Sequence, residues 1–202
     1  MVPIQRKFKK EVIRELESTY FGKYYFEVAV VLRNSLLLSS LLLNYEAWVN
    51  YTEKDVRILK KCDEILLKKI IDCDTYSSNA LRYLELGIVP VRFEIIKRKL
   101  AFLQYILKQN KESMIFQVFK ATEETSVKND FVFTCKKYLE TLKISLSFDE
   151  IENMSKFSFN KLLKEKVKVA AFSYLNIEKS KQERVRIQVA TGGSPLLAAG
   201  SH

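Results

Sequence analysis

"LRNSLLLSSLLLNYEAWVNYTEKDVRILKKCDEILLKKI" (residues 32–70) decides how this chain folds, because a leucine-rich run leads directly into a segment with helical periodicity. The run could be a membrane span, a buried helix of a bundle, or part of a larger enzyme. Its apolar stretches are short, since Ser39 and Ser40 interrupt them, and Arg33 lies near the middle. A bilayer helix needs about 20 mainly apolar residues, and a central arginine costs roughly 3 kcal/mol. The run therefore predicts a buried helix over roughly residues 25–48 and no membrane span.

The second half of the stretch predicts an amphipathic helix that begins after Thr52. Threonine is a favourable N-cap residue, and Glu53 and Asp55 in the first turn suit the positive end of the helix dipole. Apolar residues then recur at steps of three and four, which gives one apolar face. These residues are Val56, Leu59, Cys62, Ile65, Leu66 and Ile70.

"ALRYLELGIVPVRFEIIKRKLAFLQYILKQN" (residues 80–110) predicts two further helices. A short helix is expected to end at Gly87, a favourable C′ residue, and Pro90 is expected to open a longer one, where its missing N–H does no harm. The predicted buried face of the longer helix is Phe93, Ile96, Leu100, Leu103 and Leu107. Other helices are expected near residues 5–18, 112–123, 128–143, 148–154 and 156–177. The predicted fold is all-α, an irregular helical bundle of about seven to nine helices.

Composition agrees with a helical globular chain that ends in a tail. Of its 202 residues 48% are hydrophobic, and only 5 are glycine and 3 proline, few for a protein of strands and turns. We expect N-terminal helices over residues 1–75, a second helical unit over 76–180, and a tail over 181–202. The last residues, "ATGGSPLLAAGSH" (190–202), hold no acid and no aromatic residue. They predict a flexible segment of different origin from the rest.

The charge balance indicates a polyanionic partner. A formal net charge of +10 favours nucleic acid most simply, and an anionic membrane surface is the other candidate. The cations fall into three sets: Arg6, Lys7, Lys9 and Lys10; Arg92, Lys97, Arg98 and Lys99; Lys161, Lys164 and Lys168. Arg92 and Lys99 are seven residues apart and so share a helix face, which we expect to lie against a duplex backbone.

Little in the sequence favours metal chemistry or catalysis. The three cysteines have no CxxC spacing, and the one histidine is His202, which argues against a zinc knuckle and against histidine-based catalysis. Asp72 and Asp74 precede threonine and serine, an ordinary loop composition. We therefore expect no catalytic residue, no metal and no cofactor. The start, "MVPIQRKFKKEV", lacks the apolar core of a signal peptide, which favours the cytoplasm or the nucleus.

Taken in order, three motifs resemble the region behind the reverse transcriptase palm of non-LTR (LINE-type) retrotransposons. They are "LRNSLLLSSLLLNYEAW", then "YTEKDVRILKKCDEILLKKI", then "LELGIVPVRFEIIKRKLAFLQYIL". The family pattern has Leu-x-x-Ser before an apolar run and Glu-x-Trp after it, then a threonine-capped helix, then Leu-Glu-Leu-Gly-x-x-Pro. The upstream "FGKYYFEVAVVLR" is also similar to the approach to this region, so that the resemblance covers roughly residues 20–180.

The resemblance implies a truncated polymerase fragment, with a thumb-like helical pair before residue 75 and a helical connector after it. Such a fragment grips the template–primer duplex through phosphates without reading sequence. The family's Tyr-x-Asp-Asp turn is absent from this sequence, so catalysis would need a palm supplied in trans. Glu46, Trp48, Gly87 and Pro90 match structural positions of the family's motifs. Trp48 at a helix end beside a leucine-rich run is expected to be a packing anchor, and stacking on a base or sugar is the alternative. A surface left bare by the missing palm would favour self-association.

Two other readings stay open. The chain could be a helical protein-interaction adaptor whose basic surface meets an acidic protein, or a membrane-surface protein. The remaining phenylalanines fall at or near helical spacings, which predicts that they fill the core. They are Phe116, Phe119, Phe131, Phe133, Phe157, Phe159 and Phe172.

Overall fold

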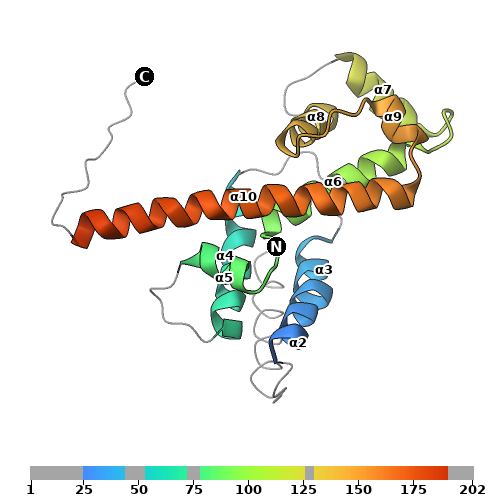
Figure 1. The fold of residues 1–202 in the computed structure, drawn as a ribbon. Helices are drawn as coiled ribbons and strands as arrows, with labels where there is room; N and C mark the ends of the chain where they lie inside the picture. Colours follow the sequence, from blue (N-terminus) through green and yellow to red (C-terminus); the bar gives the residue numbers. More distant parts are fainter. Residues whose placement is uncertain (1–24, 44–52, 72–77, 126–129, 191–202) are drawn as a thin grey trace.

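The computed structural model describes residues 25–43, 53–71, 78–125 and 130–190, and every regular element in these ranges is a helix (Figure 1). The helical turns over residues 25–41 follow one another without a break. When they are counted as one helix, the described ranges contain eight helices. The prediction of an all-α bundle of about seven to nine helices is confirmed. The predictions for Arg6, Lys7, Lys9, Lys10, Glu46, Trp48 and the last residues of the tail lie outside the described residues.

The leucine-rich run forms one helical segment with a π-helical turn in its middle. It consists of α2 (Tyr25–Leu32), η2 (Arg33–Leu37) and α3 (Leu38–Leu41). Ala29, Leu38 and Leu42 are buried, whereas Val31 and Leu43 are exposed. The segment therefore buries one face in the bundle and leaves the other in solvent. Within the part of the chain that the structure describes, no helix combines the length and apolarity needed to cross a bilayer.

A buried ion pair joins this segment to α4 (Glu53–Ile71). Arg33 donates from Nε and Nη2 to the two carboxylate oxygens of Asp63, each at 2.6 Å. The Tyr83 hydroxyl donates to Asp63 at 2.8 Å, and Arg33 Nη2 also donates to the carbonyl of Val89 at 3.0 Å. A buried charge is costly unless it is paired and hydrogen-bonded. The network therefore explains how the leucine-rich segment accommodates an arginine.

The turn between α5 (Asn79–Glu85) and α6 (Val91–Leu107) forms as predicted. Gly87 has a φ of 62° and donates its N–H to the carbonyl of Leu84 at 3.1 Å, and the Ile88 N–H reaches the carbonyl of Tyr83 at 3.1 Å. This is a Schellman motif, in which glycine supplies the left-handed conformation. Pro90 lies immediately before α6, and its carbonyl accepts the first hydrogen bonds of that helix.

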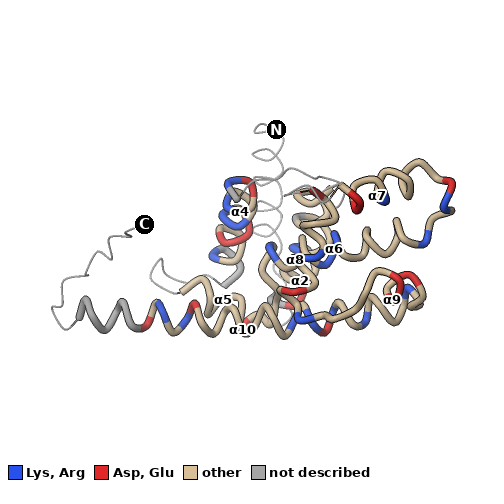
Figure 2. Tube along the Cα trace, turned by 90° about the horizontal axis from the view of Figure 1, so that it is seen from above, with Lys and Arg blue, Asp and Glu red and all other residues tan. Residues whose placement is uncertain are grey.

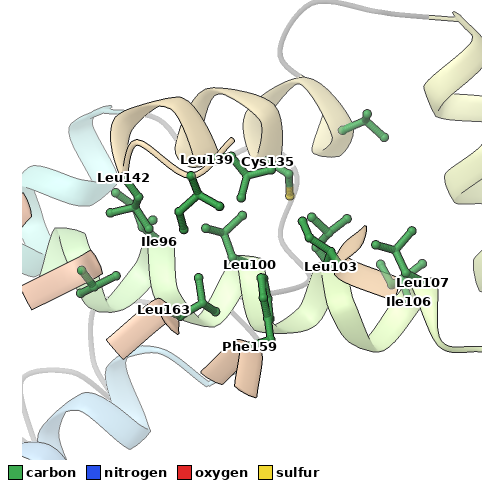
Figure 3. Packing of buried hydrophobic residues seen from close by; sticks show 14 of the residues in the cluster. Ile96, Leu100, Leu103, Ile106, Leu107, Cys135, Leu139, Leu142, Phe159 and Leu163 are labelled. Carbon is green, nitrogen blue, oxygen red and sulfur yellow. The ribbon is translucent and has the colours of Figure 1, made fainter. Parts of the chain in front are cut away.

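Helix α6 is the central element of the larger hydrophobic core. Its predicted buried face is confirmed at Phe93, Ile96, Leu100, Leu103 and Leu107. Figure 3 shows Ile96, Leu100, Leu103 and Leu107 of this face between α8 and α10, with Leu100 close to Phe159 and Leu163. Burial on both sides explains why α6 is apolar over most of its circumference.

Three short helices cover one side of α6: α7 (Met114–Thr125), α8 (Phe131–Thr141) and α9 (Phe148–Asn153). Asp130 caps α8 by accepting the Phe133 N–H, and Ser147 forms a capping box with Glu150 at the start of α9. The buried Gln104 side chain of α6 donates to the carbonyls of Ile151 and Met154, at 3.2 and 3.0 Å. These hydrogen bonds fix the end of α9 to the centre of the core.

The last helix, α10 (Lys156–Ala190), runs antiparallel to α6 and is longer than the predicted 156–177 (Figure 1). Its first half packs into the larger core, and its Leu175 reaches a second cluster that also contains Leu66, Leu67, Ala80 and Tyr83. Residues from both sides of the predicted boundary near residue 75 thus share one cluster. Helix α10 connects this cluster to the larger core.

Candidate nucleic-acid interface

The four predicted cations of α6 do not form one surface. Arg92 is exposed, whereas Lys97 makes an ion pair with Glu94 at 2.5 Å, and Arg98 donates to the carbonyl of Leu42 at 3.3 Å. Lys99 is fully buried. The prediction that Arg92 and Lys99 present one exposed face is therefore wrong. Of the four cations of α6, Arg92 is the one that is exposed and has no carboxylate partner among the described residues.

The burial of Lys99 follows from its place on α6. It is three residues after Ile96 and four before Leu103, both of which are buried, so it lies on the core side of the helix. Its ammonium is 5.7 Å from the centre of the Phe131 ring, a cation–π distance. Burial lowers the pKa of Lys99, and it raises the pKa of the nearby Cys135 thiol to about 12. The side chain cannot reach a phosphate from this position.

The third predicted set forms a row on α10. Lys161, Lys164 and Lys168 are all exposed, and none makes an ion pair with a carboxylate among the described residues. We call these three residues the lysine row. At 1.5 Å per residue the row extends roughly 10 Å along the helix axis. Lysine side chains are flexible point charges, so such a row can contact successive phosphates of one strand.

The lysine row is on the side of α10 that faces away from the larger core at the start of the helix. Phe159 and Leu163 supply the buried face there, and Lys161 lies between them in sequence but is exposed. Figure 2 shows cationic segments along α10 and on α4, and acidic segments on these two helices as well as on α9. The Lys168 ammonium is 5.7 Å from the centre of the Phe172 ring, which holds that side chain against the helix.

A second cationic row on α4 was missed by the sequence analysis. Lys54, Arg57 and Lys61 are exposed and recur at steps of three and four, opposite the buried Leu59 and Asp63. The signal was present in the sequence, because these three positions lie off the apolar stripe that defined the helix. The neighbouring Lys60 differs, since it makes an ion pair with Glu64 at 3.6 Å.

Two predictions about aromatic residues need correction. Phe157 is 80% exposed and Phe133 is 44% exposed, so neither fills the core. Phe157 is two residues before the buried Phe159, and two residues on a helix rotate a side chain by roughly 200°. The other described phenylalanines of that group are buried or partly buried.

Metal-binding and nucleophilic chemistry find little support in the described part of the chain. Within those residues no group of three or more His, Cys, Asp or Glu side chains could hold a metal ion. Asp72 and Asp74 lie outside them. Cys62 and Cys135 are free thiols, and the raised pKa of the buried Cys135 keeps it protonated and unreactive at neutral pH.

Comparison of the chain with protein-family models, with curated proteins and with solved structures gave no match.

Proposed function

We propose that this chain is a non-catalytic helical segment of a polymerase of the non-LTR retrotransposon type, and that it binds a template–primer duplex through phosphates. The observation that carries the binding part is the lysine row, which is exposed and without ion pairs to described carboxylates. The net charge of +10 supports a polyanionic ligand. The polymerase part depends on the order of the three sequence motifs alone.

Salt-titrated binding to a blunt duplex of random sequence tests the proposal. The triple variant Lys161→Gln, Lys164→Gln, Lys168→Gln should bind more weakly than the native chain between about 50 and 200 mM salt. Its plot of log K against log salt should be flatter by up to about 2.7, because each phosphate neutralised contributes about 0.9 to the slope. RNA–DNA and DNA–DNA duplexes should respond alike, since phosphates are common to both.

A second triple variant with the same loss of charge is the matched control. Lys120 and Lys181 are exposed and Lys179 is partly exposed. Lys120, Lys181 and Lys179 make ion pairs with Glu123, Glu178 and Glu183, respectively. Their replacement by glutamine should leave the slope close to that of the native chain. Lys99→Met should also leave it unchanged, since Lys99 is buried. Equal flattening by both triple variants would mean that only net charge matters, and the lysine row would lose its role.

Catalysis is not expected from the isolated chain. Because the sequence has no Tyr-x-Asp-Asp turn, the purified protein should incorporate no nucleotide into a primed template with Mg²⁺ or Mn²⁺. Incorporation that survives a second purification step would refute the non-catalytic part of the proposal.

A second candidate function is a protein-interaction adaptor, and one observation favours it. Met114, Ile115 and Val118 are exposed on α7, while Phe116 and Phe119 of the same helix are buried in the core. Helix α7 thus has a second apolar face, a feature typical of protein contacts. The same titration separates the two candidates, because an adaptor has no reason to prefer duplex over another polyanion such as polyglutamate.

A further inference from the structure

The exposed Phe157 lies on the same helix face as the lysine row. Residues 157, 161, 164 and 168 follow one another at steps of four, three and four, so they fall within about 60° of each other around the axis of α10. Phe157 is 80% exposed at the start of the helix. An aromatic ring in solvent at one end of a row of cations has no packing role in the described structure.

We propose that Phe157 and the lysine row together bind single-stranded nucleic acid, with the ring stacked on an unpaired base and the lysines on the adjoining phosphates. This inference rests on the proposed function and extends it to the strand that continues beyond a duplex. Sites for single strands combine a cationic track with aromatic side chains on which bases stack. Every base has a π-face, so stacking tolerates any sequence. This agrees with the proposed function, in which the protein binds phosphates independently of sequence.

The row fits this ligand better than it fits a membrane. An interfacial helix needs a continuous apolar face beside its cations. Phe157 is the only apolar residue among the four positions, and the other three are lysines. The nearest exposed apolar residue on the same helix, Val169, lies about 100° away from Lys168 around the axis. The acid within this part of α10, Glu165, is beside the row and not in it.

Single substitutions at Phe157 can test the stacking without disturbing the core. Phe157→Ala removes the ring, and Phe157→Leu keeps an apolar side chain but has no aromatic face. The probe is an oligothymidylate of about 12 nucleotides, which is within the range of single-strand site sizes. Both variants should bind it at least about fivefold more weakly than the native chain, since stacking of one base corresponds to that factor or more. The salt slope should not change, because phenylalanine carries no charge.

Three controls make the result specific. An abasic oligomer of the same length keeps the phosphates without bases, so the native chain and Phe157→Ala should bind it equally. A blunt duplex should also be bound equally by both. Val169→Ala shortens an exposed side chain that lies outside the lysine row, and it should leave oligothymidylate binding unchanged.

The outcomes separate this inference from the proposed function. If the native chain binds the duplex through the lysine row but Phe157→Ala matches it on oligothymidylate, the stacking is refuted and the duplex binding stands. Equal weakening on the abasic oligomer would also refute stacking. If Phe157→Ala loses affinity only for vesicles of phosphatidylserine and phosphatidylcholine, the ring contacts membranes and the inference is wrong. Failure of the native chain to bind any duplex would overturn the proposed function itself.

Discussion

The guanidinium of Arg33 and the carboxylate of Asp63 form a bidentate pair in the interior, with both N–O distances at 2.6 Å and neither side chain more than 1% exposed. Arg33 is the first residue of the π-helical turn η2, and Asp63 is on α4. The π-helical turn is thus where the leucine-rich segment is joined to α4. Tyr83 and the carbonyl of Val89 complete the hydrogen bonds of the pair.

Removing the charge of Asp63 should strongly destabilise the fold. Asp63→Asn leaves the Arg33 guanidinium buried without its counter-ion, which typically costs about 3–5 kcal/mol. Glu64→Gln on the same helix is the matched control, because its pair with Lys60 is partly exposed and should contribute less than about 1 kcal/mol. Urea denaturation of both variants measures the two free energies. Similar losses would show that the buried pair has no special role.

Replacing both members of the pair should cost less than breaking it. In Arg33→Met with Asp63→Leu no charge is left buried, and apolar side chains of similar volume often match a buried ion pair in stability. The double variant should therefore unfold at higher urea than Asp63→Asn. A double variant less stable than the single one would indicate that the lost hydrogen bonds of Tyr83 and Val89 dominate.

Two residues in the left-handed conformation should respond to substitution with opposite signs. Gly87→Ala should cost about 1 kcal/mol, and the cause is conformational, because a Cβ at Gly87 would have no neighbouring atom within 4 Å. Lys143 has a φ of 53° at the end of α8, where it occupies the same place in a Schellman motif. Lys143→Gly should stabilise the fold by up to about 1 kcal/mol. Thermal or urea unfolding that gives both changes the same sign would contradict this.

Periodicity predicted the helices because it reports which face of each helix meets a core, and the buried face of α6 was found in this way. It could not predict the Arg33–Asp63 pair, since the partners are 30 residues apart in sequence and meet only through packing. A local signal was nonetheless available for Asp63, which lies between the apolar Leu59 and Leu66 at steps of four and three.

The prediction of the interface was wrong for Lys99, because it considered the charges of α6 without the apolar residues on the same helix face. Lys99 shares a helix face with Ile96 and Leu103 as well as with Arg92, and apolar contact decided its position. The lysine row is exposed because its positions lie off the face that Phe159 and Leu163 bury at the start of α10, and its contact with nucleic acid stays a prediction. The prediction that Phe157 fills the core was wrong, because it followed from residue type. The rotation of roughly 200° between Phe157 and the buried Phe159 around the helix axis points the two rings in opposite directions.

Gln104 should contribute more to stability than Gln109, which lies five residues later in the chain. Gln104→Met removes the donor to the carbonyls of Ile151 and Met154 and leaves them unpaired at the core, at an expected cost of about 1–3 kcal/mol. Gln109→Met removes an exposed hydrogen bond to the Tyr105 carbonyl and should cost less than about 0.5 kcal/mol. Hydrogen exchange should also show faster opening of α9 in Gln104→Met. Equal free energies for the two variants would refute the role given to Gln104.

The free energy of unfolding should fall at alkaline pH through the buried Cys135. Its pKa is raised from the ordinary 9.0 to about 12, so the folded protein keeps a proton that the unfolded chain loses. The contribution is complete below pH 9.0 and is lost as the pH rises towards about 12, at up to about 1.4 kcal/mol per pH unit. The lowered pKa of the neighbouring Lys99 acts in the opposite sense, and Asp130 adds to the raised pKa of the thiol. Because both groups are also present in Cys135→Ala, the difference between native chain and variant reports the thiol together with its electrostatic interaction with Lys99. Urea denaturation at several pH values should give a shallower decline for Cys135→Ala, and parallel declines would exclude Cys135 as the titrating group.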